Sequence, residues 1–332
     1  MILKNYLKEF DYIRRIMKKK IILIAGPTAS GKTKASVTLA KQINAEIICT
    51  DSMQVYKHMN IGTAKVTQDE MEGVAHYMID ELEPSQSNNV AWFKDKVTTY
   101  INQIHAKGKI PILVGGTGFY INAILFDTTF EDDDTNEYRS ELFNLAKVHG
   151  SLALYHRLEE LDPDSAKVIH PNNTKRLVRA IEYYYQTGTP ISKHNFEQKS
   201  KRLQNISPYD YHFFALNMDR ATLYNRINQR VDMMLQEGLL EEVKNLYEQG
   251  FTEDMVSMKA IGYKEFFPYF NSELSLDETI EKLKQNTRRY AKRQLTWFKN
   301  QADPIFIEVD KLEFDADKIA NTMLLHTNLT YN

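Results

Sequence analysis

Short, mostly apolar runs alternate along this chain with longer stretches in which apolar residues recur every three or four positions. The runs at 21–25, 46–50 and 110–114 are typical of parallel strands buried on both faces. Residues 35–43 and 90–107 have helical spacing. Strands are also predicted at 211–216 and, at an edge, 304–309, with helices at 219–237, 238–249 and 276–301. This alternation predicts an α/β protein with a parallel sheet flanked by helices.

The pattern changes between residues 128 and 206, where no strand-like run occurs. Apolar positions are helical over 137–148, 151–161 and 171–187 and again after 192, with prolines and glycines between these segments. We therefore predict an all-helical domain at 128–206, inserted into an α/β core made of 20–127 and 207–332. Residues 1–19 are interpreted as a dispensable N-terminal extension.

Composition narrows the cellular context. Of 332 residues 42% are hydrophobic and 26% charged, and no apolar run is long enough to span a bilayer. Cys49 is the only cysteine, which excludes a disulfide framework and favours a reducing cytoplasm. No feature suggests an obligate interface, so a monomer is expected.

Charge is unevenly distributed. The net charge of −2 does not favour a general polyanion binder. The helix predicted at 276–301 is nevertheless rich in basic side chains. Between residues 281 and 300 it carries one acid, Glu281, and seven basic residues: Lys282, Lys284, Arg288, Arg289, Lys292, Arg293 and Lys299. An excess of this kind is suited to contacts with nucleic-acid phosphates, whereas the acidic stretch at 127–137 is equally explained as a solvated surface.

A phosphate-binding motif follows the first strand. It fits the pattern G-x-x-x-x-G-K-[ST] and comprises Gly26, Pro27, Thr28, Ala29, Ser30, Gly31, Lys32 and Thr33. Such a loop presents backbone N–H groups and a helix N-terminus to phosphate oxygens. Lys32 adds a mobile cation, and the Thr33 hydroxyl can ligate Mg²⁺. The motif predicts binding of a di- or triphosphate.

Two further segments end strands of the predicted sheet. Asp51 follows the second strand and is expected to face the same crevice as the phosphate loop, where it could act as a general base. The glycine-rich segment 115–118 follows the third strand and allows backbone to approach a ligand closely. These features alone favour a small-molecule kinase.

Seven ordered motifs, taken together, resemble one family, the tRNA dimethylallyltransferases or isopentenyl-tRNA transferases, over about residues 20–300. They are Gly26–Thr33, Asp51–Tyr56, Asn60–Lys65, Gly115–Tyr120, His170–Asn173 leading into Arg176 and Arg179, Ile261–Lys264, and Ala291–Phe298. The resemblance implies a P-loop NTPase-like core. It also implies transfer of a dimethylallyl group from its pyrophosphate to the exocyclic amine of the adenosine 3′ of the tRNA anticodon.

The resemblance also implies roles for particular residues. The phosphate loop, with Lys32, Thr33 and Mg²⁺, would hold the pyrophosphate leaving group, and Arg226 would add a cation unless it only forms a surface ion pair. Asp51 would orient or deprotonate the adenine amine, and Thr117 would contact the flipped base. Positions expected to contact the tRNA anticodon stem-loop are Asp51, Ser52, Met53, Gln54, Thr117, Arg139, Lys175, Arg176, Arg179, Lys259, Gly262, Tyr263 and Lys264. Trp297 is expected in the core rather than against RNA bases.

Three alternatives stay open at this point: a P-loop small-molecule kinase, an adenylate isopentenyltransferase acting on free nucleotides, and a non-catalytic RNA-binding module. The helical insertion and the basic helix favour a large RNA over a free nucleotide. The intact Lys32, Thr33 and Asp51 favour an enzyme over a binding module.

Overall fold

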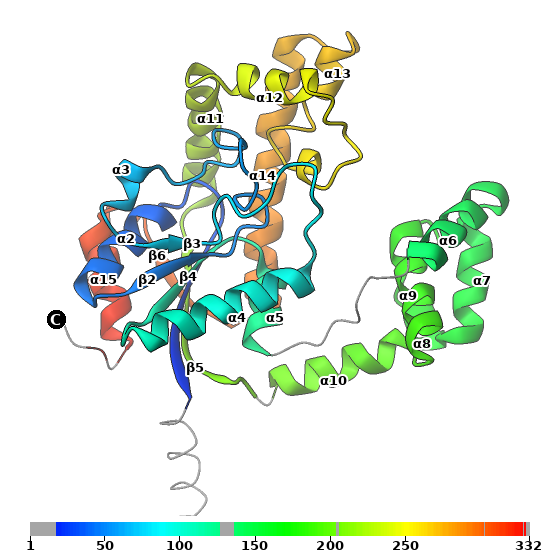
Figure 1. Cartoon of the computed structure of the whole chain (residues 1–332), viewed down its shortest axis with the longest axis horizontal. Helices are drawn as coiled ribbons and strands as arrows, with labels where there is room; N and C mark the ends of the chain where they lie inside the picture. Colours follow the sequence, from blue (N-terminus) through cyan, green and yellow to red (C-terminus); the bar gives the residue numbers. More distant parts are fainter. Residues whose placement is uncertain (1–17, 127–135, 204–205, 302, 328, 330–332) are drawn as a thin grey trace, which may run out of the picture. The chain divides into compact units, whose positions relative to one another are not determined.

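The computed structural model describes residues 18–126, 136–203, 206–301, 303–327 and 329 (Figure 1). The chain forms two compact units, one of residues 1–124 with 208–332 and the other of 125–207. The expected N-terminal extension falls almost entirely outside the described residues, as does most of the acidic stretch.

The first unit is built on a six-stranded sheet. Its strands lie in the order β3-β2-β4-β1-β5-β6, and all five pairings are parallel. Their bounds are β1 Lys19–Ala25, β2 Glu46–Cys49, β3 His76–Tyr77, β4 Pro111–Gly115, β5 Tyr209–Asn217 and β6 Ile305–Glu308. The fold class predicted from the sequence is confirmed, and β6 lies at an edge as expected. Because β1 has a neighbour on each side, the segment that follows it begins at the carboxyl end of an interior strand.

Helices surround this sheet and extend beyond it. In chain order they are α2 Lys32–Gln42, α3 Gln68–Met71, α4 Val90–Ala106, α5 Gly118–Leu125, α11 Arg220–Gln236, α12 Leu239–Glu248, η1 Ser257–Lys259, α13 Phe267–Phe270, α14 Leu276–Gln301 and α15 Ala316–Leu325. Residues 261–266 form turns between η1 and α13, because Gly262 takes a positive φ of 100° that interrupts a helix.

Burial on both faces of the sheet explains its apolar strands. Ile22 and Ile24 of β1 pack with residues of α2 and α15 in one cluster, and these two helices lie side by side (Figure 1). Ile21 and Leu23 are also fully buried and, by strand alternation, point to the opposite face. No described helix is long and apolar enough to cross a membrane.

The second unit is helical throughout its described residues. It contains α6 Asn136–His149, α7 Ser151–Leu161, α8 Pro163–Ala166, α9 Thr174–Thr187 and α10 Ile191–Leu203. Leu142, Leu154, Leu158 and Leu177 form the centre of its own hydrophobic core. The buried Asp162 accepts hydrogen bonds from the backbone N–H groups of Ser165 and Ser192, and so ties the start of α10 to that of α8. The unit therefore has the core and the polar contacts of an independent helical domain.

Candidate active site

The phosphate motif forms the turn between the central strand β1 and helix α2. Ala29 and Gly31 both have positive φ, 63° and 87°, and Gly31 occupies the position just before the helix begins at Lys32. A glycine suits this position, since it adopts the left-handed region without steric cost. The backbone and the N-terminus of α2 therefore have the local geometry of an anion cradle.

Lys32 lies inside this cradle. Its Nζ donates a 2.7 Å hydrogen bond to the carbonyl oxygen of Pro27. Burial, with a contribution from the nearby Arg230 guanidinium, lowers the pKa of Lys32 to about 8, although Asp51 acts in the opposite direction. An anion bound here would relieve the repulsion between the two cations.

Asp51 stands two residues beyond the end of β2, in the same neighbourhood. Its Oδ1 accepts a 2.9 Å hydrogen bond from the backbone N–H of Met53, which fixes the orientation of the carboxylate. Burial raises the pKa of Asp51, while the hydrogen bond from Met53 and the charge of Lys32 oppose that rise. A half-buried, oriented carboxylate with a raised pKa is a suitable proton acceptor.

Two arginines of α11 face the loop, as their spacing of four residues allows. Arg226 donates a 2.9 Å hydrogen bond from Nε to the carbonyl oxygen of Ala29, and its guanidinium stacks 4.2 Å from the ring centroid of Phe314. Its observed contacts are therefore not those of the alternative surface ion pair. Arg230 is close enough to Lys32 and Asp51 to affect both of their pKa values. Arg230 has no role among the residues predicted from the sequence.

A cavity of about 1040 Å³ unites these groups. The predicted site residues that line it are Thr28, Ala29, Ser30, Gly31, Lys32, Thr33, Asp51, Ser52, Met53, Gln54, Arg226, Lys259, Gly262 and Lys264. Arg230 also lines it. Segments far apart in sequence thus converge on one space within the first unit. Gly26, Pro27, Thr117 and Tyr263 are not among the lining residues.

Thr117 lies beside this cavity, directly after the lining glycines Gly115 and Gly116. The Tyr290 side chain of α14 lies near both Thr117 and Asp51. Burial, and then the charge of Asp51, raise the pKa of Tyr290 to about 12, and the side chains of Thr117 and Gln294 lie beside it. Gln294 also donates a 3.0 Å hydrogen bond to the carbonyl oxygen of Gly116. The phenol therefore stays protonated near Asp51 at neutral pH.

Tyr263 requires a correction to its predicted role. Its side chain is 0% exposed, and its hydroxyl donates a 2.6 Å hydrogen bond to Glu242 Oε1. A side chain enclosed in this way cannot contact RNA directly in this conformation. Lys259 and Lys264, on either side of Tyr263 in the sequence, are exposed and line the cavity, where cations can reach a ligand.

A second, open hollow of about 510 Å³ follows the basic helix α14. It is lined by Arg289, Lys292, Arg293, Thr296, Trp297 and Asn300. Trp297 is half-buried rather than a full core residue, because one side of its indole packs against Gly118. The groove therefore combines three cations with an aromatic surface, a composition that suits single-stranded nucleic acid.

The remaining predicted RNA contacts belong to the helical unit. Arg139 and Arg179 both donate to Glu182 Oε2, over 2.8 Å and 3.1 Å, and Glu182 is buried. Lys175 and Arg176 are exposed in the first turn of α9. The four basic residues are thus carried by α6 and α9 of one compact unit.

The donor groups of the cavity suit Mg²⁺ bound together with a substrate phosphate. Thr33 offers a hydroxyl and Asp51 a carboxylate, and both line the cavity. No group of three or more acidic, histidine or cysteine side chains that could hold a metal occurs among the described residues. Mg²⁺ is commonly held by one or two protein ligands, phosphate oxygens and waters, so this sparse set is sufficient.

Comparison with known proteins matches this architecture. The family model described as IPP transferase matches residues 54–301. The tRNA dimethylallyltransferase of Lachnoclostridium phytofermentans is 52% identical over 308 residues, covering 92% of this chain and 97% of that protein. The one from Bacillus pumilus is 48% identical over 293 residues, covering 88% and 90%.

Two solved structures are similar in fold as well as sequence. The crystal structure of tRNA delta(2)-isopentenylpyrophosphate transferase from Staphylococcus epidermidis has a TM-score of 0.68 and 45% identity, covering 94% of this chain and 99% of that one. A eukaryotic dimethylallyltransferase acting on tRNA has a TM-score of 0.80 and 32% identity, covering 94% and 81%.

The fold and its phosphate cradle define a P-loop α/β enzyme of the transferase class. Within that class, the chain belongs to the IPP transferase family, whose members compared above are tRNA dimethylallyltransferases.

Proposed function

We propose that this protein transfers a dimethylallyl group from dimethylallyl pyrophosphate to the exocyclic amine of the adenosine 3′-adjacent to the anticodon in tRNA. The observation that carries the proposal is the convergence of Lys32, Asp51 and Arg226 on one cavity. This arrangement provides cations for a departing pyrophosphate and an oriented carboxylate for the amine. In the reaction a C–N bond forms at the allylic carbon while its C–O bond to pyrophosphate breaks.

The phosphate loop would hold the leaving group. Negative charge grows on the pyrophosphate as the allylic C–O bond breaks, and fixed positive groups lower the free energy of that transition state. Lys32 and the N-terminus of α2 supply such groups within the loop. Among the described residues Arg226 hydrogen-bonds Ala29 through Nε, which leaves its other guanidinium nitrogens for a phosphate oxygen. Arg230 adds a further cation in the same space.

Asp51 would act on the amine. An exocyclic adenine amine is a weak nucleophile, so holding it in line with the allylic carbon contributes more than basicity. The carboxylate would accept a hydrogen bond from the amine and then its proton once the C–N bond has formed. Thr117 and Tyr290 are candidates to contact the adenine, which must leave the anticodon-loop stack to reach this position.

Mg²⁺ is the proposed cofactor. When bound, it would neutralise charge on the pyrophosphate, with Thr33 as its protein ligand and Asp51 near it. The steps assigned to Lys32, Arg226 and Asp51 above do not depend on the number of ions.

The RNA would be bound chiefly through phosphates. Lys259 and Lys264 on the cavity wall, the groove of Arg289, Lys292 and Arg293, and the cluster of Arg139, Lys175, Arg176 and Arg179 provide cations in both units. These contacts position the RNA, whereas the pocket around Asp51 would select the base.

One transfer assay tests the proposal. Labelled dimethylallyl pyrophosphate is incubated with unmodified tRNA or with AMP, each with and without ATP. Label entering tRNA without ATP is expected. Label entering AMP would identify an adenylate isopentenyltransferase instead, and ATP-dependent phosphate transfer a kinase. Binding of tRNA with no transfer under any condition would indicate a non-catalytic RNA-binding module.

A further inference from the structure

A half-buried carboxylate, Glu242 in α12, holds one wall of the cavity in place. Its Oε2 accepts hydrogen bonds of 2.9 Å from the backbone N–H groups of both Asn60 and Ile61. Its Oε1 accepts one of 3.0 Å from the N–H of Gly62 and one of 2.6 Å from the Tyr263 hydroxyl. A carboxylate offers about four acceptor sites, and all four are used here. No uncharged side chain of this shape can accept the same set of donors.

Close packing against Tyr263 and Gly262 also restricts the position of the segment Asn60–Gly62, which is called the loop below. A Cβ atom on Gly62 would lie 2.5 Å from the Tyr263 ring, and one on Gly262 would lie 3.1 Å from the carbonyl oxygen of Gly62. The two backbones therefore touch directly. Burial and the adjacent Glu242 charge raise the pKa of Tyr263, so the phenol remains a donor. The buried Glu265 then joins this turn to α14 by accepting from Gly262 N–H and Asn286 Nδ2, each over 2.9 Å.

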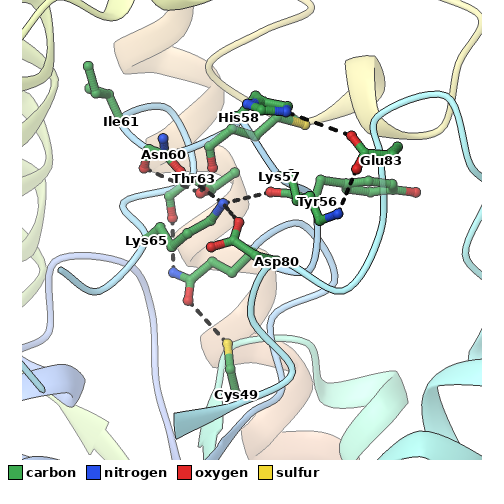
Figure 2. Close-up of polar contacts among 12 residues, drawn as sticks. Cys49, Tyr56, Lys57, His58, Asn60, Ile61, Thr63, Lys65, Asp80 and Glu83 are labelled. Atoms are coloured by element: carbon green, nitrogen blue, oxygen red, sulfur yellow. Dashed lines mark hydrogen bonds and ion pairs between the residues drawn. The ribbon is translucent and has the colours of Figure 1, made fainter. Parts of the chain in front are cut away.

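The other side of the loop is connected to the Asp51 turn. Figure 2 shows Lys65 at the centre of this region, with Nζ donating to the Tyr56 carbonyl oxygen, to Asn60 Oδ1 and to Asp80 over 2.6, 2.9 and 2.6 Å. Gln54 Nε2 donates to the carbonyl oxygens of Thr63 and Ala64, over 3.1 and 3.0 Å. Gln54 Oε1 in turn accepts from Cys49, immediately before the Asp51 turn. The position of the loop is therefore linked to the position of Asp51.

The groups on this wall of the cavity are better suited to RNA than to dimethylallyl pyrophosphate. Its three successive N–H groups donate to the Glu242 carboxylate and are therefore not available to bind a pyrophosphate. The same cavity carries exposed Lys259 and Lys264, which suit RNA phosphates, and the pyrophosphate cradle lies in a different segment, 26–33.

We infer that Glu242 is a positioning residue for the RNA substrate: by holding Asn60–Gly62 against Tyr263, it keeps the wall of the cavity formed by residues 60–66 in the shape that receives the nucleotide to be modified. The inference rests on the proposed function, because it assigns the RNA to this cavity. It adds a residue that contacts neither the pyrophosphate loop nor the reacting atoms.

The test compares three variants in steady-state transfer assays. Glu242→Gln keeps the side-chain shape but presents an NH₂ group to two donors, so kcat/KM for tRNA should fall about 10- to 100-fold, mainly through KM. Tyr263→Phe removes one of the four donors to Glu242 and should lower kcat/KM for tRNA about 3- to 10-fold. Glu241→Gln, the exposed neighbour in α12, is the matched control and should behave as wild type. KM for dimethylallyl pyrophosphate should change less than about twofold in all three.

A purely structural role would give a different result. Partial unfolding of Glu242→Gln lowers the active fraction and hence kcat, but leaves KM for tRNA unchanged, and that outcome would overturn the inference. If Glu242→Gln does not fold, an unchanged tRNA KM in the milder Tyr263→Phe variant overturns it. Transfer of label by the wild-type protein to tRNA is measured in parallel. If the wild type transfers none, the proposed function fails, whereas wild-type transfer beside an unchanged tRNA KM in Glu242→Gln overturns only the present inference.

Discussion

Arg226 Nε donates a 2.9 Å hydrogen bond to the carbonyl oxygen of Ala29, and so joins α11 to the phosphate loop. Arg226→Gln should therefore lower kcat about 10- to 100-fold, because it removes a cation from the leaving group and loosens the loop. Arg220→Gln is the control, since Arg220 is exposed at the start of the same helix and stacks on Tyr224. Single-turnover rates with tRNA measure the effect. Equal rates for both variants would exclude Arg226 from the chemical step.

Asp51→Asn should abolish turnover, by roughly 1000-fold or more, because the amide cannot accept the amine proton. The affinity for tRNA should stay within about twofold, since most RNA contacts in the proposal involve phosphates elsewhere. Filter binding and labelled transfer measured on the same preparation separate the two effects. Glu241→Gln, on the exposed side of α12, serves as a control on the transfer rate, and a substantial residual rate in Asp51→Asn contradicts its assignment.

Lys32 predicts a pH dependence for binding of dimethylallyl pyrophosphate. Its pKa is about 8 rather than the usual 10.5, so the free enzyme loses this charge as the pH rises through 8. The affinity should therefore decrease above pH 8, and at pH 8.5 binding should take up more than about half a proton, because the anion restores the charged form. Calorimetry in buffers of different ionisation enthalpy measures this uptake. Lys32→Met should bind weakly, with no such uptake, and equal proton uptake in wild type and variant would refute the assignment.

The same lysine links pH to folding stability in the absence of ligand. The unfolded state binds a proton at Lys32 up to pH 10.5, whereas the folded state loses it near pH 8. The free energy of unfolding should therefore rise with pH between these values relative to the Lys32→Met variant. Below pH 8 the difference between the two proteins should be constant.

The groove on α14 predicts a steep salt dependence of tRNA binding. Replacing Arg289, Lys292 and Arg293 together with glutamine should lower the slope of log affinity against log salt by about two to three. Lys311→Gln, an exposed lysine in the segment between β6 and α15, should leave the slope unchanged. Binding titrations at several salt concentrations measure both slopes. A wild-type affinity that hardly responds to salt would contradict the phosphate contacts.

Gly118 and Trp297 should be coupled in stability. A Cβ atom on Gly118 would lie 2.1 Å from the indole, so Gly118→Ala should lower the free energy of unfolding by about 1–3 kcal/mol. Adding Trp297→Leu to this variant should recover part of the loss, because the smaller side chain makes room for the methyl group. Urea unfolding followed by circular dichroism measures the wild type, the two single variants and the double variant. A double variant that loses the sum of the two single losses would contradict this contact.

The parts of the fold that the sequence predicted are those with long periodic signals. The buried strands and long helices such as α14 follow from apolar spacing alone, and the shared edge of parallel strands predicted that Asp51 would lie near the phosphate loop. Strand β3 was missed because two residues are too few to show a pattern. A positive φ such as that of Gly262, which keeps residues 261–266 in turns, is likewise not visible in apolar spacing.

Contacts between distant segments could not be predicted from the sequence, because they leave no local pattern in it. Glu242 hydrogen-bonds backbone groups about 180 residues away, and backbone donors have no sequence signature. Arg230 was visible as a neighbour of Arg226 on the helix, but its proximity to Lys32 depends on how α11 packs. The burial of Tyr263 likewise depends on a close approach of two glycine segments rather than on the motif that contains it.

The pairing of β1 with β5 has a consequence for the order in which the protein forms during synthesis. Every residue of β1, from Lys19 to Ala25, is matched with β5, from Tyr209 to Ala215. The ribosome therefore has to complete the helical unit before one side of the phosphate-loop strand acquires its neighbour. The helical unit can fold early because its contacts are local. Until β5 is synthesised, the backbone hydrogen-bonding groups on one edge of β1 remain unpaired and could pair with another chain. The segment proposed to bind the substrate pyrophosphate is thus among the first to be translated and among the last to be enclosed.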